Sequence, residues 1–266
     1  MGDFAARKKD HLEYEICRGF PAGVSHCFTT RYGGVSKGYL ASLNLGLNRG
    51  DSQENVLRNY EILGNALGFS VEDLVFTRQT HTDLVERVGK SNRGEGLFRP
   101  VLPERDGLVT DEPGVALAIF SADCTPVLFY DPVRRAVGGC HAGWRGMAKG
   151  IPAKTVQAME REYGCKPENI FAAIGPCIGS CCFETSEDVP RAMLEALGEE
   201  ATRAITQKGE KYHVDLKKLA KIWLERAGVS QIFTSGDCTA CLPEKYWSHR
   251  VTHGERGSQA AIIMLK

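Results

Sequence analysis

The sequence predicts a single α/β domain built on a mixed β-sheet, for three reasons. The chain has 266 residues, of which 42% are hydrophobic, enough for one large core. Strand-like and helical segments are interspersed without a strict βαβ order, which favours a mixed sheet. No repeat, low-complexity tract or long linker divides the chain. We therefore expect residues 1–19 to form an N-terminal extension with the first strand, and residues 20–266 to form the domain.

Short apolar or alternating runs predict the strands. They lie at residues 12–16, 24–30, 74–77, 83–88, 115–122, 126–130, 136–140, 169–174, 229–233 and 259–265. Helical spacing predicts helices at residues 53–67, 152–163, 187–197 and 216–227. Asp51 with Glu54 resembles a capping box at the start of the first helix. The glycine-rich segment 89–107 is expected to be a mobile loop.

Charge and the N-terminus limit the classes of partner. The 33 basic residues balance 33 acidic ones, and no long basic cluster indicates a nucleic-acid partner. The first residues contain no apolar signal core, and no run has the length of a membrane span. We therefore expect a cytoplasmic protein without nucleic-acid or membrane partners, whose ten cysteines are reduced. The sequence does not indicate an oligomeric state.

The segment 121–146 contains the first candidate site. Two apolar runs, 126–130 and 136–140, predict a hairpin with a turn at Asp131-Pro132. If the loop is 131–134, Tyr130 pairs with Arg135, and Cys124 then faces His141. Directly opposed residues have Cβ atoms about 4.5–5.5 Å apart, close enough for one metal ion to bind both side chains. A shift by one residue would point the two side chains to opposite faces.

A third ligand is available at His81, whose neighbours are polar. His81, Cys124 and His141 give an N/S/N set with one position open for water, as in catalytic zinc sites. Cys124 and His141 could instead form a metal-free cysteine nucleophile with its base, the ring being oriented by Asp123 or Gln79. In the simplest interpretation Cys124 is a small buried hydrophobic residue.

Several adjacent motifs resemble one known family. They are TRYGGVS (30–36), LNLGLNRGD (43–51), QTH (79–81), DGLVT (106–110), SADC and PVLFYDP within 121–132, HAGWRG (141–146), and IGPCIG and CCFE within 174–184. From about residue 20 to the end, the chain resembles the YfiH-like family. This family is also called the purine nucleoside phosphorylase family or the multicopper polyphenol oxidase (laccase) domain.

The resemblance implies a layered α/β/β/α fold with zinc bound by His81, Cys124 and His141. It also implies phosphorolysis of adenosine, inosine and methylthioadenosine, with adenosine deamination at the same site. Purine nucleosides and phosphate would then be the partners. Copper oxidase chemistry is not expected, because copper prefers many imidazoles and this chain has seven histidines with no His-x-His pair. A cysteine hydrolase or amidase using Cys124 and His141, and a non-catalytic metal- or partner-binding module, are the alternative functions.

Four residues are candidates for binding the substrate. The planar guanidinium of arginine suits phosphate, and the candidates are Arg49, Arg145 and Arg250. Arg145 also lies beside His141, just before an expected helix start. Asn44 could bind ribose hydroxyls or form a local turn. The family usually has a second arginine after Arg250 and a TGRQ-like segment, but this chain has SHRVTHGERGSQ at 248–259.

The other cysteines of the C-terminal half raise a second question. Cys177, Cys181 and Cys182 could assemble a structural zinc site with Cys238 and Cys241. A single Cys-x-x-Cys is weak support for a metal, and the resemblance implies none there. We therefore expect these residues to be buried or redox-inactive thiols.

Overall fold

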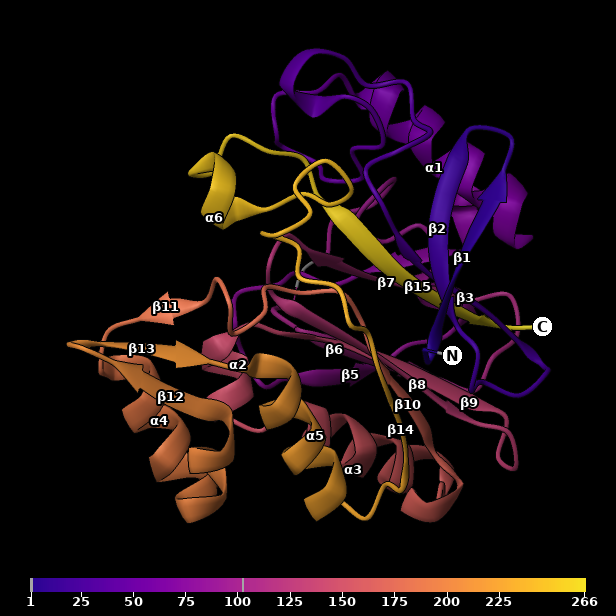
Figure 1. The fold of residues 1–266 in the computed structure, drawn as a ribbon. Helices are drawn as coiled ribbons and strands as arrows, with labels where there is room; N and C mark the ends of the chain where they lie inside the picture. The colour runs from indigo at the N-terminus through magenta and orange to yellow at the C-terminus, as the bar shows by residue number, and fades with distance from the viewer. Residues whose placement is uncertain (1, 102) are drawn as a thin grey trace.

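Two six-stranded sheets pack face to face, and helices cover their outer faces (Figure 1). The computed structural model describes residues 2–101 and 103–266. Three apolar clusters separate the layers: one lies between the two sheets, and one lies on the outer face of each sheet. This arrangement confirms the predicted α/β fold and the α/β/β/α layers that the resemblance implies. No helix in the described ranges is long and apolar enough to span a membrane.

The first sheet has the order β1-β2-β3-β15-β7-β4. Its strands are β1 (Phe4–Lys9), β2 (Leu12–Cys17), β3 (Val24–Thr29), β15 (Gln259–Leu265), β7 (Ala116–Ser121) and β4 (Leu74–Phe76). All neighbours are antiparallel except β4 and β7. The C-terminal strand β15 therefore lies in the middle of the sheet, next to β3 from the start of the chain.

The second sheet has the order β14-β10-β8-β9-β6-β5. Its strands are β14 (Gln231–Thr234), β10 (Phe171–Ile174), β8 (Thr125–Asp131), β9 (Ala136–Ala142), β6 (Gly107–Thr110) and β5 (Val85–Arg87). The outer pairs β10–β14 and β5–β6 are parallel, whereas the central pairs are antiparallel. Both sheets are therefore mixed, as expected.

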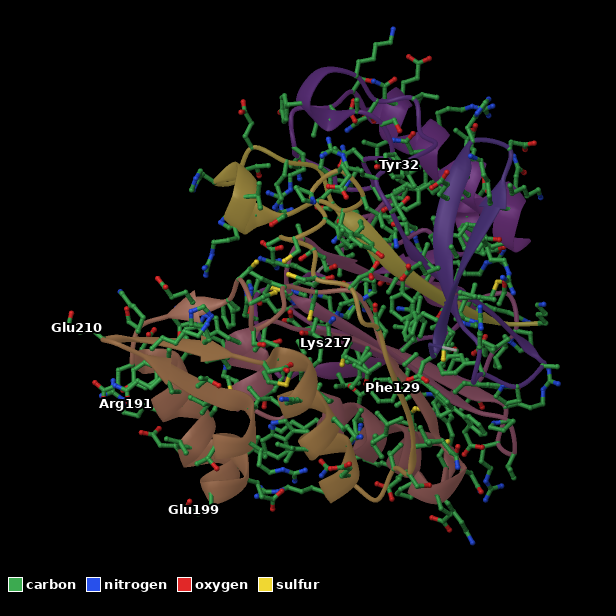
Figure 2. The ribbon with its side chains drawn as sticks, viewed as in Figure 1. Tyr32, Phe129, Arg191, Glu199, Glu210 and Lys217 are labelled. Carbon is green, nitrogen blue, oxygen red and sulfur yellow. The ribbon has the colours of Figure 1, made fainter. Side chains whose placement is uncertain are left out.

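The helices lie outside the sheets. α1 (Gln53–Leu67) packs on the first sheet. The second sheet is covered mainly by α3 (Ile151–Tyr163) and α5 (Leu216–Arg226), and the remaining helices are α2 (Trp144–Ala148), α4 (Asp188–Leu197) and α6 (His249–Thr252). A third, small sheet has the order β11-β13-β12, from β11 (Glu184–Thr185), β13 (Lys211–Val214) and β12 (Ile205–Lys208). In Figure 2 charged side chains such as Glu210 project outward, whereas Phe129 lies inside.

Strand alternation assigns each side chain to one core. In β15, Ala261 and Ile263 face the layer between the sheets, while Ile262 and Met264 face α1. This is the period-two pattern of a strand that is buried on both faces. It explains why the apolar run at 259–265 reads as continuous and was predicted with its correct bounds.

Some elements differ from the sequence prediction. β1, β6, β11, β12, β13 and the short helices α2 and α6 were not predicted as elements. The start of α1 is also corrected: the Ser52 side chain accepts from the Asn55 N–H at 3.1 Å, so Ser52 and not Asp51 is the N-cap. In segment 89–107, expected to be mobile, Arg105 is buried and its guanidinium is 2.6 Å from the carboxylates of both Glu86 and Glu95.

The β8–β9 hairpin forms with a register two residues from the predicted one. Asp131 pairs with Ala136 and Pro126 pairs with His141, so the four-residue loop is 132–135 and not 131–134. The Asp131 carboxylate accepts the N–H groups of the loop residues Val133 and Arg134, which keeps Asp131 in the strand. Because side chains alternate between the two faces of a sheet, a shift of two residues leaves each side chain pointing to the same face. Cys124 and His141 therefore still point to the same side.

Candidate functional site

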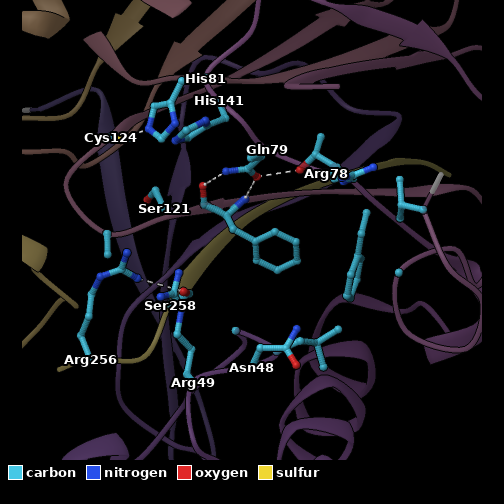
Figure 3. Close-up of a pocket in the computed structure, with 18 residues that line it drawn as sticks. Asn48, Arg49, Arg78, Gln79, His81, Ser121, Cys124, His141, Arg256 and Ser258 are labelled. Atoms are coloured by element: carbon cyan, nitrogen blue, oxygen red, sulfur yellow. Dashed lines mark hydrogen bonds between the residues drawn. The ribbon is translucent and has the colours of Figure 1, made fainter. Parts of the chain in front are cut away.

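Three ligand side chains from separate segments meet at one end of the β8–β9 hairpin. His141 is in β9, Cys124 immediately precedes β8, and His81 lies in the segment between β4 and β5. Their ligand atoms all lie within 4.8 Å of one another, and His81 Nε2 is 3.9 Å from Cys124 Sγ. Figure 3 shows the three side chains together at the edge of a pocket. The structure thus brings together all three residues that the sequence singled out as ligands.

The buried carboxylate of Asp106 holds two of these ligands in place. One oxygen lies 2.7 Å from His141 Nδ1, which leaves Nε2 of that ring to face a ligand. The same carboxylate accepts backbone N–H groups from Thr80, His81 and Thr82. His81 has a φ of 62°, an uncommon value for a residue with a side chain, and these bonds compensate for it.

Asp106 has the orienting role that the sequence hypothesis gave to Asp123 or Gln79. Asp123 instead accepts hydrogen bonds from Thr239, Ser248 and the Arg250 backbone, all on the C-terminal segment. Gln79 bonds to the backbone of Phe120 in β7. Asp106 could have been suspected only from the DGLVT motif, because nothing in its local spacing ties it to His141.

The charges of the three side chains depend on one another. Burial alone would raise the pKa of the Cys124 thiol, but the adjacent His141 and His81 outweigh this effect and lower the pKa to about 6. Burial would likewise lower the pKa of His141, but Cys124 and Asp106 raise it to about 9. Without a metal, a thiolate–imidazolium pair is therefore favoured near neutral pH.

The same residues fit a metal ion. Thiolate sulfur and imidazole nitrogen are ligands that first-row transition metals prefer, and the Asp106–His141 bond is typical of a metal-bound histidine. Space for the ion depends on Gly143: a Cβ there would lie 2.4 Å from the His81 ring and 3.2 Å from Cys124 Sγ. The three-residue set could hold one ion and leave a position open.

A large pocket opens beside these side chains. It has a volume of about 500 Å³, within the usual range for small-molecule sites. Phe76 and Phe120 form apolar parts of its wall, and Arg49, Arg78 and Arg256 provide positive charge. The pocket can accommodate a molecule that has both an aromatic and an anionic part.

Arg256 was not among the residues selected from the sequence. Burial and the positive charge of Arg49 lower its pKa to about 10, so it remains charged at neutral pH. Its Nη1 donates to the Gly257 carbonyl and to the Ser258 hydroxyl, while its buried Nε has no partner among the described residues. Arg256 lies in the GERGSQ segment, which could have pointed to it, but the order of glycine and arginine in this segment differs from the TGRQ-like family pattern. Arg49 does line the pocket, as its candidacy required.

A smaller pocket of about 260 Å³ shares His81, Cys124 and Arg256 with the larger one. Trp144 and Phe183 form apolar parts of its wall, and Arg250 also lines it. The Arg250 guanidinium donates to the carbonyls of Cys182 and Glu184, at 2.9 and 3.0 Å. Arg250 is thus at the site, but its guanidinium is bonded to the backbone.

The structure places the two other candidates away from the pocket walls. Asn44 is fully buried, and its amide bonds to Gly46, Asp51 and Ser258, which matches the turn-forming interpretation. Arg145 is exposed, and its guanidinium lies 4.2 Å from the centre of the Trp144 ring. Neither is among the residues that line the two pockets.

All ten cysteines are free thiols, as expected. Four of them, Cys181, Cys182, Cys238 and Cys241, form a second group whose sulfurs all lie within 4.8 Å of one another. Cys177 is not in this group, because it is buried with its sulfur toward the Ile178 carbonyl. Of these four, Cys238 is buried as expected and Cys182 is partly buried, whereas Cys181 and Cys241 are exposed, contrary to the expectation of burial.

Comparison with known proteins identifies the family. The model of the family described as "Multi-copper polyphenol oxidoreductase laccase" matches residues 25–266. The chain belongs to this family. This confirms the resemblance inferred from the motifs. The word copper in the family description does not fit the candidate site, because the site has two histidines and one cysteine rather than many imidazoles.

Relatives cover nearly the whole chain. Purine nucleoside phosphorylase YlmD of Geobacillus stearothermophilus is 40% identical over 248 residues, covering 91% of this chain and 90% of that protein. Purine nucleoside phosphorylase YfiH of Escherichia coli is 36% identical and covers 92% of this chain and 95% of its own. The solved structure of YlmD from Geobacillus stearothermophilus superposes with a TM-score of 0.92 at 36% identity, covering 98% of both chains.

Proposed function

We propose that this protein is a zinc-dependent purine nucleoside phosphorylase that acts on adenosine, inosine and methylthioadenosine. The observation that carries the proposal is the pocket in which Arg49 and Arg256 face the same space as His81, Cys124 and His141. The names of the curated relatives support this reaction. Zinc is the proposed ion because it prefers a mixed nitrogen and sulfur set, and when bound it would supply a Lewis acid beside the substrate.

The protein's own residues supply the binding and orientation that phosphorolysis needs. A phosphate oxygen forms a bond to C1′ of the ribose, the C1′–N9 bond breaks, and the purine leaves with the electron pair and is then protonated. Arg49 and Arg256 would hold the phosphate, because guanidinium groups donate paired hydrogen bonds to its oxygens. The aromatic wall at Phe76 and Phe120 would face the apolar purine.

Adenosine deamination at the same site is the finer part of the proposal. Deamination consumes water, whereas phosphorolysis consumes phosphate, so the two reactions use different nucleophiles at different carbons. His81 and Cys124 line both the larger and the smaller pocket, so water could reach them from either one. A cytoplasmic location and the absence of nucleic-acid or membrane partners remain predictions.

A second candidate function is supported by one observation. The lowered pKa of Cys124 and its proximity to His81 and His141 also suit a metal-free cysteine hydrolase or amidase. Its nucleophile would be the Cys124 thiolate with His141 as the base. The arginines of the larger pocket have no evident role in that reaction.

One experiment separates these functions. The purified protein is incubated with adenosine, inosine and methylthioadenosine over a range of phosphate concentrations, and the products are resolved chromatographically. We expect ribose 1-phosphate to rise with phosphate, while inosine formed from adenosine stays constant or falls. A Cys124→Ser protein is the matched variant, and its undiminished phosphorolysis would remove Cys124 from the reaction. The hydrolase would be supported instead if neither product formed and if the metal-free protein had an amidase activity that thiol alkylation abolished.

A further inference from the structure

The second cysteine group joins two loops that leave neighbouring strands. Cys181 and Cys182 follow β10, whereas Cys238 and Cys241 follow β14, which is parallel to β10. The two loops also meet at a short bridge between Cys177 and Cys238. Parallel neighbouring strands direct their carboxyl ends to one edge of a sheet, so residues more than fifty positions apart in sequence are brought together here.

The distances within this group suit one tetrahedral ion. Cys241 Sγ lies 3.4 Å from the sulfurs of both Cys181 and Cys182, and all four sulfurs lie within 4.8 Å of one another. Four sulfurs bound at about 2.3 Å to one zinc ion are about 3.8 Å apart by tetrahedral geometry. The set therefore has the size and the ligands of a closed Cys₄ site.

Backbone donors near Cys238 favour the thiolate form of this one cysteine. The Gly179 N–H donates to Cys238 Sγ at 3.1 Å, and the Cys241 N–H also bonds to this sulfur within the Cys-x-x-Cys turn. Such N–H donors stabilise negative sulfur. Gly179 also leaves room for the group: an added Cβ would lie 3.1 Å from Cys181 Sγ and 3.3 Å from Cys238 Cβ.

Nearby lysines match the charge of a tetrathiolate site. Lys217, Lys218 and Lys221 line a hollow of about 370 Å³ together with Cys181 and Cys238, and the acidic residue in its wall is Asp215. Four thiolates and one zinc ion would carry a net charge of −2, which nearby positive charge favours. Lys218 and Lys221 also pair with Asp215 and Glu225, at 3.8 and 3.9 Å. The buried Lys217, labelled in Figure 2, also donates to the carbonyls of Ser235 and Asp237 and so fixes the loop that leads to Cys238.

We propose that Cys181, Cys182, Cys238 and Cys241 bind a second, structural zinc ion. Binding replaces the four thiol protons with four zinc–sulfur bonds and releases these protons to solvent. The ion ties the loops after β10 and β14 together, as structural zinc does where closed ligand sets join separate segments.

This ion also supports one wall of the catalytic region. The carbonyl of Cys182 accepts from the Arg250 guanidinium, and the next residue, Phe183, lines the smaller pocket beside His81 and Cys124. Fixing Cys182 therefore fixes Phe183 and the bonded Arg250. The second ion makes no contact with substrate in this arrangement, and it acts through the position of that wall.

The test counts zinc in the full-length protein. Protein is reduced, loaded with zinc alone, freed of excess and analysed for metal and protein. We expect about two zinc ions per chain in the parent, and about one in both Cys124→Ala and Cys181→Ser/Cys241→Ser, because each group binds one ion. Cys177→Ala is the matched control: it removes a neighbouring thiol outside the group and should leave the zinc content at the parental level. A parental zinc content in Cys181→Ser/Cys241→Ser would overturn the proposal.

A second measurement needs no cluster variant. In the zinc-loaded parent, the exposed Cys181 and Cys241 should resist a thiol alkylating reagent and should become labelled after a chelator removes the metal. Mass mapping of the labelled peptides provides the readout. Equal labelling of these cysteines with and without zinc would overturn the proposal. So would a disulfide between Cys241 and Cys181 or Cys182 in protein whose zinc is bound only at the His81–Cys124–His141 set.

Discussion

The two groups of ligand side chains in this protein are built in opposite ways. His81, Cys124 and His141 form a partly buried three-residue set that opens onto a pocket of about 500 Å³. Cys181, Cys182, Cys238 and Cys241 form a four-residue set in which two cysteines are exposed. An incomplete ligand set beside a cavity is suited to chemistry, whereas a complete one between loops is suited to holding them together. The number of ligands and the adjoining space thus distinguish the two groups.

The largest effect is expected from breaking the three-residue set itself. Cys124→Ala should reduce nucleoside cleavage by more than about 100-fold, since loss of a residue that only orients a ligand already costs about 10–100-fold. Zinc at the four-cysteine group should be unaffected. Initial rates at saturating phosphate, with metal analysis of the same preparation, check this. A rate close to that of the parent would show that the two groups do not differ in function as described.

The next effect concerns the residue that holds the three-residue set in position. Asp106→Asn keeps an acceptor oxygen but removes the charge next to His141, so zinc affinity at this set should fall by about 10–100-fold. Competition with a chelator measures the affinity. Asp131→Asn is the matched control, because Asp131 is equally buried but its carboxylate accepts from its own turn and not from His141. Equal affinities in the two variants would mean that Asp106 does not tune the metal ligands.

The arginines of the larger pocket provide a third comparison. Arg256→Ala should raise the phosphate concentration for half-maximal cleavage by roughly 10–100-fold, since a hydrogen bond to a charged group contributes about 1.5–3 kcal/mol. Arg145→Ala should have a smaller effect, because Arg145 is exposed and lies over Trp144. Zinc content should stay the same in both. A larger effect from Arg145→Ala would indicate that Arg145, the arginine favoured by the sequence analysis, binds the phosphate.

The smallest effect separates the thiols of the two groups in metal-free protein. Burial raises the pKa of Cys124 less than the two histidines lower it, and the result is about 6, whereas burial and the neighbouring thiols raise the pKa of Cys181 to about 11. Because only the thiolate is nucleophilic, alkylation of Cys124 should reach half its maximal rate near pH 6 and that of Cys181 only at alkaline pH. Mass mapping after timed alkylation from pH 5 to 9 measures both. Parallel profiles would contradict the difference.

The sequence predicted those parts of the molecule that depend on local pattern. The β8–β9 hairpin was predicted from two apolar runs and an Asp-Pro turn, and the face shared by Cys124 and His141 was correct. The register differed because the Asp131 side chain bonds to its own turn, which no periodicity reports. The proximity of His81, Cys124 and His141 was also predicted, because histidine and cysteine among polar neighbours are unusual in a core.

What the sequence did not predict depends on contacts between distant segments. Asp106 meets His141 across 35 positions, and Arg256 reaches the pocket from the far end of the chain. The four-cysteine group needs β10 and β14 to be neighbours in one sheet, an order that the sequence does not specify. Asn44 and Arg145 had suitable side chains, but a buried amide network and an aromatic neighbour occupy them.

The single carboxylate of Asp106 has a consequence for how an ion would be exchanged at His81, Cys124 and His141. Because it bonds to the 80–82 backbone and to the His141 ring at once, the His141 imidazole and the backbone that carries His81 are positioned by the protein itself. An apoprotein with these contacts would be expected to lose and regain an ion with little rearrangement of these segments. The loops that carry the four cysteines lack an equivalent carboxylate among the described contacts to their sulfurs. When metal is scarce, we therefore expect an ion at His81, Cys124 and His141 to leave and return reversibly. Loss of an ion from the four cysteines would instead loosen the loops that carry them.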